Sequence, residues 1–73
     1  DAITITRDIS GDFVVSGKSL EKLVAMTNFG NDEAVRRFQY IWRIKGIDKL
    51  LREKGIKEHD TVHIGEMEFE FRD

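Results

Sequence analysis

The hydrophobic period of the chain changes twice, and this change constrains the fold more than any other feature. Apolar and polar residues alternate over 2–7 and again over 61–72, a period of two that is typical of half-buried β-strands. Between these segments, from Ser19 to Gly55, apolar residues recur every three or four positions, as on one face of an α-helix. The sequence therefore predicts strands at both ends and helices in the middle.

The N-terminal segment predicts a β-hairpin. Ile3 and Ile5 lie on the same face of the first strand, 2–7, and are expected to face the core. Turn-forming residues fill positions 8–12, and the short apolar run 13–15 follows as the second strand.

A first and a third helix are predicted on either side of a longer central one. The first begins near Ser19, carries the stripe Leu20, Leu23, Val24 and Thr27, and is expected to end at Asn28 and Gly30. The third is expected to run from about Asp48 to Gly55, with Leu50 and Leu51 inward and Ile56 packing back on it.

The central helix has the clearest boundaries. Asn31 is a good N-cap, Asp32 and Glu33 place negative charge where the helix dipole favours it, and Gly46 is expected to be a left-handed cap. At about 100° per residue, one side carries Ala34, Val35, Phe38, Ile41 and Trp42. The opposite side carries Arg36, Tyr40 and Arg43, so this helix has two distinct faces.

The C-terminal segment predicts a second hairpin. If Gly65 and Glu66 form a two-residue type II′ turn, Ile64 faces Met67 and Val62 faces Phe69, while the solvated face pairs His63 with Glu68 and Thr61 with Glu70. The predicted fold class is α+β, in the order ββαααββ. It is a single domain spanning 1–73, in which a small antiparallel or mixed four-stranded sheet packs against two to three helices.

Composition excludes several classes of site. The chain has 73 residues and no cysteine, which excludes disulfides, thiolate zinc sites and a cysteine nucleophile. A net charge of -2 argues against nucleic-acid binding through overall charge, although a local basic patch stays open. No apolar run is long enough for a membrane span, so no membrane partner is expected. The start at Asp1, without a basic-then-apolar leader, predicts an excised or processed segment that lacks a signal peptide.

Two other motifs carry weak signals for chemistry. His59 and His63 are four residues apart with acids nearby, but they fall in a loop and a strand, so we expect surface histidines rather than a zinc site. Residues 16–19, Ser-Gly-Lys-Ser, resemble the end of a phosphate-binding loop, but Asp12 stands where the first glycine of that motif belongs. This segment is expected to be a helix start, and no catalytic, cofactor-binding or metal-binding residue is predicted.

The outer face of the central helix is the remaining candidate site. Arg36, Tyr40 and Arg43 stand at positions i, i+4 and i+7, with Arg37 on the flank. Such a stripe could bind RNA phosphates and a base, or an acidic protein surface. The alternative is an ordinary solvated helix face on which Glu33 pairs with Arg36 or Arg37.

With these elements placed, the chain resembles the C-terminal domain of the Obg family of GTPases. The resemblance rests on Leu-Val-Ala-Met-Thr at 23–27 and Asn-Asp-Glu-Ala-Val-Arg-Arg-Phe-Gln at 31–39. It continues through Gly46-Ile47-Asp48, the stretch 50–55, Asp60-Thr61-Val62, Ile64-Gly65 and the alternating Glu-Phe tail. His59 departs from the family, which usually shows a glycine before Asp-Thr-Val.

The resemblance implies an accessory domain of a larger cytoplasmic GTPase that binds GTP and magnesium. Family members hydrolyse GTP slowly, associate with the large ribosomal subunit during its assembly and respond to the starvation nucleotide guanosine tetraphosphate. No nucleotide-binding motif falls on this chain, so we expect no cofactor and no GTP hydrolysis here. Two roles stand: a regulatory module that contacts ribosomal RNA or protein, or a docking module that packs on the G domain of the same chain or on another protein. The charged last strand predicts a monomer.

Overall fold

The computed structural model describes residues 2–72, so the first and last residues of the predicted domain, Asp1 and Asp73, lie outside it. Two strands, three helices and two strands follow one another, which confirms the predicted order and the α+β fold class. The elements are β1 (Thr4–Arg7), β2 (Phe13–Ser16), α1 (Lys18–Met26), α2 (Asp32–Ile44), α3 (Ile47–Glu53), β3 (Thr61–Ile64) and β4 (Met67–Glu70). Within the described range, no helix combines the length and apolar character that crossing a bilayer requires.

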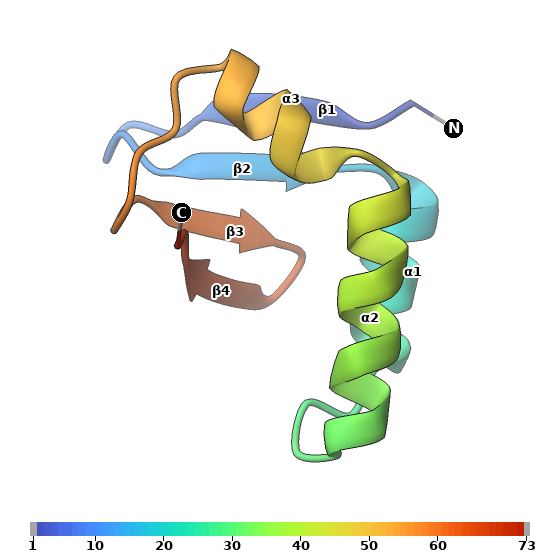
Figure 1. Cartoon of the computed structure of the whole chain (residues 1–73). Helices are drawn as coiled ribbons and strands as arrows, with labels where there is room; N and C mark the ends of the chain where they lie inside the picture. The colour runs from blue at the N-terminus through green and yellow to red at the C-terminus, as the bar shows by residue number, and fades with distance from the viewer. Residues whose placement is uncertain (1, 73) are drawn as a thin grey trace.

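The sheet is mixed, which decides between the two alternatives that the sequence left open. Its strand order is β1-β2-β3-β4, with an antiparallel hairpin at each side (Figure 1). The central pair is parallel and places Phe13 opposite Val62 and Val14 opposite His63. A parallel pair needs a long connection, and the three helices between β2 and β3 provide it.

The register of the second hairpin is the predicted one. Ile64 pairs with Met67 and Val62 with Phe69, and the polar pairs fall between them as expected. Gly65 has a φ of 57°, the positive value that the first position of a type II′ turn requires. The alternation of side chains therefore places every large apolar residue of this hairpin on the face that meets the helices.

The core lies between the sheet and the helices. Figure 1 shows α3 lying over the sheet, whereas the N-terminal half of α2 extends beyond it. Ile3 and Ile5 are partly buried and pack against the core, as predicted. The buried hydrophobic residues are Phe13, Val15, Leu20, Val24, Phe38, Trp42, Ile47, Leu51, Ile56, Val62, Ile64 and Phe71.

The boundaries of α1 differ from the prediction. The helix begins at Lys18, where the Gly17 amide donates to Glu21 Oε2 at 3.0 Å. This contact confirms that the segment resembling a phosphate loop is a helix start. The helix ends at Met26, before the predicted stop at Asn28, because Thr27 adopts extended backbone angles and its hydroxyl donates to the Leu23 carbonyl at 2.7 Å.

The joint between α2 and α3 follows the predicted glycine cap. Gly46 has a φ of 69°, in the left-handed region, and α3 begins at Ile47, one residue earlier than expected. The Trp42 indole donates from Nε1 to Asp48 Oδ1 at 2.8 Å across this joint. Leu51 is fully buried as predicted, whereas Leu50 is only half-buried.

The backbone at His59 accounts for the glycine that the Obg family usually has at this position. Its φ is 78°, and it is the one non-glycine residue among 2–72 with a positive φ. Glycine adopts this conformation without the steric cost that a Cβ atom adds. The imidazole contacts the Glu70 carboxylate, and this hydrogen bond raises the pKa of His59 above its ordinary value of 6.5.

We expect His59→Gly to raise the melting temperature by about 3–5 °C at about pH 9 and by less at about pH 5. The substitution removes the steric strain of a Cβ atom on left-handed backbone at every pH, but it also removes the contact with Glu70. Because the pKa of His59 is raised in the folded chain, that contact stabilises fully below the unfolded pKa and is lost as the pH rises through the folded pKa. Thermal unfolding followed by circular dichroism tests this. His59→Ala, which removes the contact and keeps a Cβ, should give no gain, and a lower melting temperature for His59→Gly at about pH 9 contradicts the prediction.

Candidate functional site

The face predicted to bind a partner is built on α2, whose ends are well determined. The Asn31 side chain accepts a hydrogen bond from the Ala34 amide at 3.0 Å, which confirms the predicted N-cap. Acidic residues occupy the first turn and Arg43 the last, in agreement with the helix dipole. Phe38 and Trp42 are buried, so the orientation of the helix is set by its inner face.

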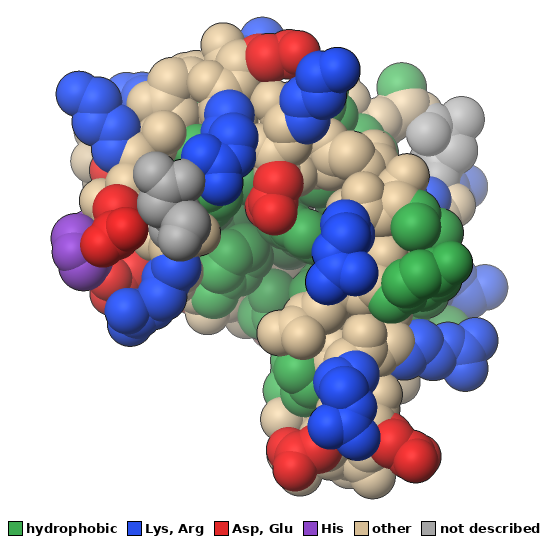
Figure 2. All heavy atoms as spheres, in the orientation of Figure 1, with side chains coloured by type: hydrophobic (Ala, Val, Ile, Leu, Met, Phe, Trp, Pro, Cys, Tyr) green, Lys and Arg blue, Asp and Glu red, His purple; other side chains and the backbone are tan. Residues whose placement is uncertain are grey.

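The four predicted site residues lie together on the outer side of α2. Arg36, Arg37, Tyr40 and Arg43 are all exposed, and we call them the arginine face. At 1.5 Å per residue, Arg36 and Arg43 are about 10 Å apart along the helix axis. Figure 2 shows basic side chains along this helix, with acidic side chains gathered at its N-terminal end.

The arginines of this face are not engaged with carboxylates of the same chain. Among residues 2–72, no acidic side chain is at ion-pair distance from Arg36, Arg37 or Arg43. The alternative in which Glu33 neutralises Arg36 or Arg37 is therefore not what the structure shows. The guanidinium groups are free to contact carboxylates or phosphates of another molecule.

Ile44 lies beside this face, and it was not among the predicted site residues. Its exposed fraction is 63%, and that of Tyr40, one helical turn earlier, is 57%. Figure 2 shows a hydrophobic patch near the C-terminal end of α2. Ile44 is four residues after Tyr40 and seven after Arg37, so helical spacing places it beside the arginine face and could have revealed it from the sequence.

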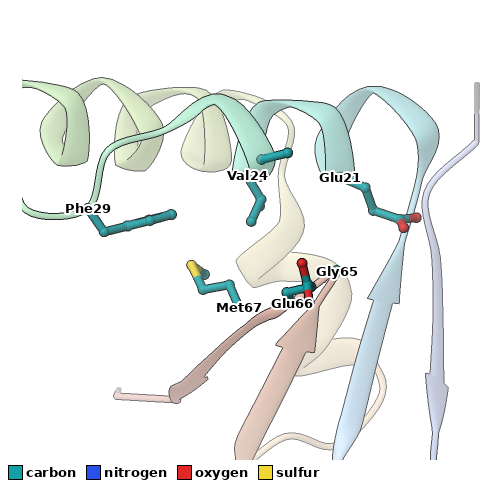
Figure 3. A pocket seen from close by; sticks show the side chains of 7 residues that line it. Glu21, Val24, Phe29, Gly65, Glu66 and Met67 are labelled. Carbon is teal, nitrogen blue, oxygen red and sulfur yellow. The ribbon is translucent and has the colours of Figure 1, made fainter.

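A pocket lies between α1 and the turn from β3 to β4. It has a volume of about 470 Å³ and is lined by Glu21, Val24, Ala25, Phe29, Gly65, Glu66 and Met67. Figure 3 shows the Phe29, Val24 and Met67 side chains around it, while Glu21 turns toward the start of α1, where it caps the helix. The lining of this pocket is therefore mainly apolar.

The two histidines contact different acidic side chains. His63 lies on β3, where its Nε2–H donates to Asp12 Oδ2 at 2.8 Å and its Nδ1 is 3.7 Å from Glu68 Oε1. The hydrogen bond to Asp12 raises the pKa of His63 above its ordinary value. His63 therefore does face Glu68, as predicted, but its nearer partner is Asp12, in the turn after β1. The sequence alone gave no signal for that contact, because the two residues are 51 positions apart.

Comparison with known proteins decides the family. A family described as "Domain of unknown function (DUF1967)" matches residues 3–71. The chain belongs to this family. The DUF1967 domain is also 52% identical over 69 residues to a protein named GTPase Obg from Bacillus velezensis. It is 50% identical over 72 residues to GTPase Obg from Streptococcus sanguinis and 51% identical over 71 residues to that from Staphylococcus aureus.

These matches confirm the resemblance to the C-terminal domain of the Obg family. The aligned residues cover 94%, 99% and 97% of this chain, in the order in which the relatives are named above. By contrast, the domain spans only 16% of the length of each of those relatives. These relatives are thus about six times as long as this chain.

Proposed function

We propose that this DUF1967 domain is an accessory binding module of a cytoplasmic Obg-type GTPase, and that its arginine face binds RNA of the large ribosomal subunit. The parent protein would bind GTP and magnesium and hydrolyse GTP. Its part in ribosome assembly and in the response to guanosine tetraphosphate would depend on contacts of this kind. The proposal rests on the names of the relatives and on one structural observation, the exposed and unpaired state of Arg36, Arg37 and Arg43.

The composition of the arginine face fits RNA. Arginine contacts phosphate oxygens through its planar fork of donors, and a tyrosine ring offers a stacking platform for an unpaired base. Tyr40 lies between Arg36 and Arg43 along the helix, so the ring is flanked by positive charge on both sides. The overall charge of -2 means that binding must be local to this face.

We expect the domain to co-sediment with purified large subunits at low salt and to lose affinity steeply as salt rises. If three arginines each neutralise a phosphate, the affinity should fall roughly 20- to 40-fold between 50 and 200 mM salt. The Arg36→Glu, Arg43→Glu double variant should lose about tenfold or more of the low-salt affinity.

A charge-matched control separates this site from general electrostatics. Lys54→Glu with Lys57→Glu makes the same change in net charge on the segment that leads into β3, away from α2. That variant should bind nearly as well as the unaltered domain. Equal losses in the two double variants, or no binding at low salt, would overturn the proposal.

A second function is favoured by the exposure of Ile44 beside Tyr40. Tyrosine and arginine around a small apolar centre are typical of protein interfaces. The domain would then dock on the G domain of its own chain or on another protein, without contacting the ribosome. In that case Ile44→Ser should weaken the complex with the GTPase portion of the parent protein, and the affinity should respond weakly to salt.

The domain itself is not proposed to be an enzyme. We expect no magnesium-dependent GTP hydrolysis by the isolated 73 residues, because no phosphate-binding loop motif falls on this chain. A phosphate-release assay with and without magnesium checks this expectation. Turnover that rises with the concentration of the purified domain would contradict it.

A further inference from the structure

The fold brings three potential metal ligands together on a part of the molecule that the proposed function does not use. Asp8 and Asp12 flank the turn between β1 and β2, and His63 lies in the middle of β3. Because β2 and β3 are parallel neighbours, with Val14 opposite His63, the start of β2 lies beside the His63 ring. We call Asp8, Asp12 and His63 the hairpin cluster.

We propose that the hairpin cluster is a binding site for a divalent metal ion of the zinc type. One ligand atom from each residue lies within 4.8 Å of the other two. His63 Nε2 is 2.8 Å from Asp12 Oδ2 and 3.9 Å from Asp8 Oδ2. Donors bound to one zinc ion at about 2.0–2.2 Å are themselves about 3 to 4 Å apart, so these spacings need little adjustment.

The carboxylate of Asp8 is held in place by the turn. Its Oδ1 accepts hydrogen bonds from the Ser10 amide at 2.9 Å and the Asp12 amide at 3.0 Å. Oδ1 is therefore occupied by the backbone, and Oδ2 is the oxygen that faces His63. A ligand whose orientation is fixed before the ion arrives loses less conformational freedom on binding.

The other ring nitrogen of His63 faces a third carboxylate. Its Nδ1 lies 3.7 Å from Glu68 Oε1 on the neighbouring strand β4, which is beyond hydrogen-bond distance. Without a metal, Nε2 carries the proton that Asp12 accepts, so a bound ion would displace this proton and leave Nδ1 as the protonated nitrogen. A small movement would then let Nδ1–H donate to Glu68, which would make Glu68 a positioning residue for His63.

The type of ion follows from the donors and from their exposure. One imidazole nitrogen with two carboxylate oxygens suits zinc, whereas magnesium prefers oxygen ligands alone. The side chains of His63, Asp8 and Asp12 are 30%, 36% and 33% exposed, so an ion could enter from solvent and complete its coordination with water. Such a site would join the turn after β1 to the centre of the sheet.

The test is a titration of the 73-residue chain with zinc chloride, followed by isothermal calorimetry and by the NMR signals of the His63 ring. At about pH 8 we expect one ion per chain and a shift of the His63 signals, with no comparable response to magnesium chloride. His63→Gln and Asp12→Asn should each weaken zinc binding about tenfold or more, and Glu68→Gln should weaken it without changing the stoichiometry.

His59→Gln is the matched control, because His59 also contacts acidic side chains but lies outside the hairpin cluster. It should leave zinc binding unchanged, and circular dichroism will show whether each variant is folded. Asp8→Asn keeps the hydrogen bonds of the turn, so it reports on the metal if the other variants fail to fold. No zinc binding at millimolar concentration, or an equal loss in His59→Gln and His63→Gln, would overturn the proposal. None of these variants touches the arginine face, so failure here would leave the proposed function standing.

Discussion

Replacing Leu51 by alanine is expected to lower the free energy of unfolding by about 2–5 kcal/mol, because the side chain is fully buried and its loss leaves a cavity. Leu51 lies on α3, the helix that lies over the sheet in Figure 1. A chain of this size has a total stability of roughly 4–11 kcal/mol, so the loss is a large fraction of the total. The effect is large because a small domain has few core residues to share the loss.

Urea denaturation followed by the fluorescence of Trp42, the one tryptophan, would measure this change. Leu50→Ala is the matched control, since Leu50 is the adjacent residue of the same helix and is only half-buried. Leu50→Ala should lower the free energy of unfolding clearly less than Leu51→Ala does. Equal losses for the two variants would contradict the assignment of Leu51 as the core residue of α3.

Replacing Trp42 by alanine is expected to cost about 3–5 kcal/mol. Trp42 contacts residues of three elements. The centroid of its ring lies 5.8 Å from that of Phe38 on α2 and 5.3 Å from that of Phe69 on β4. Its indole N–H donates to Asp48 on α3. Because the N-terminal half of α2 extends beyond the sheet, few other side chains anchor this helix. Loss of Trp42 should therefore loosen the helix that carries the arginine face.

Two companion variants separate the contributions of Trp42. Trp42→Phe keeps an aromatic ring against Phe38 and Phe69 and should cost less than the alanine variant. Asp48→Ala removes only the acceptor and should cost about 1–3 kcal/mol, since it leaves the indole N–H of Trp42 without its partner. Thermal unfolding by circular dichroism measures all three. A loss for Trp42→Ala no larger than that for Asp48→Ala would show that the ring does not anchor α2.

Most of the arginine face could be predicted from the sequence. Arg36, Tyr40 and Arg43 could be placed on one side of α2 because helical geometry repeats every 3.6 residues and the caps at Asn31 and Gly46 were recognisable. Ile44 stands four residues after Tyr40, so the same geometry places it beside this face, although we did not predict it as a site residue. The exposed fraction of its side chain depends on how far the neighbouring elements cover the helix, and the order of residues within α2 does not contain that information.

The hairpin cluster could not be predicted from the sequence, because its residues come from different hairpins. His63 was paired with Glu68 from the register of one hairpin, which is a local property of the turn at Gly65. Its nearer partner, Asp12, belongs to the other hairpin, and the parallel pairing of β2 with β3 brings the two hairpins together. That pairing is a non-local contact, and no hydrophobic period specifies it.

The sequence by itself determined the order of the elements, the register of the second hairpin and the two faces of α2. Each of these depends on residues a few positions apart, which meet whenever the local backbone forms. Only the tertiary structure decided the strand order and the meeting of Asp8 and Asp12 with His63. These features join residues far apart in the chain, and such contacts form only when burial of the whole core outweighs the entropy of closing the loops between them.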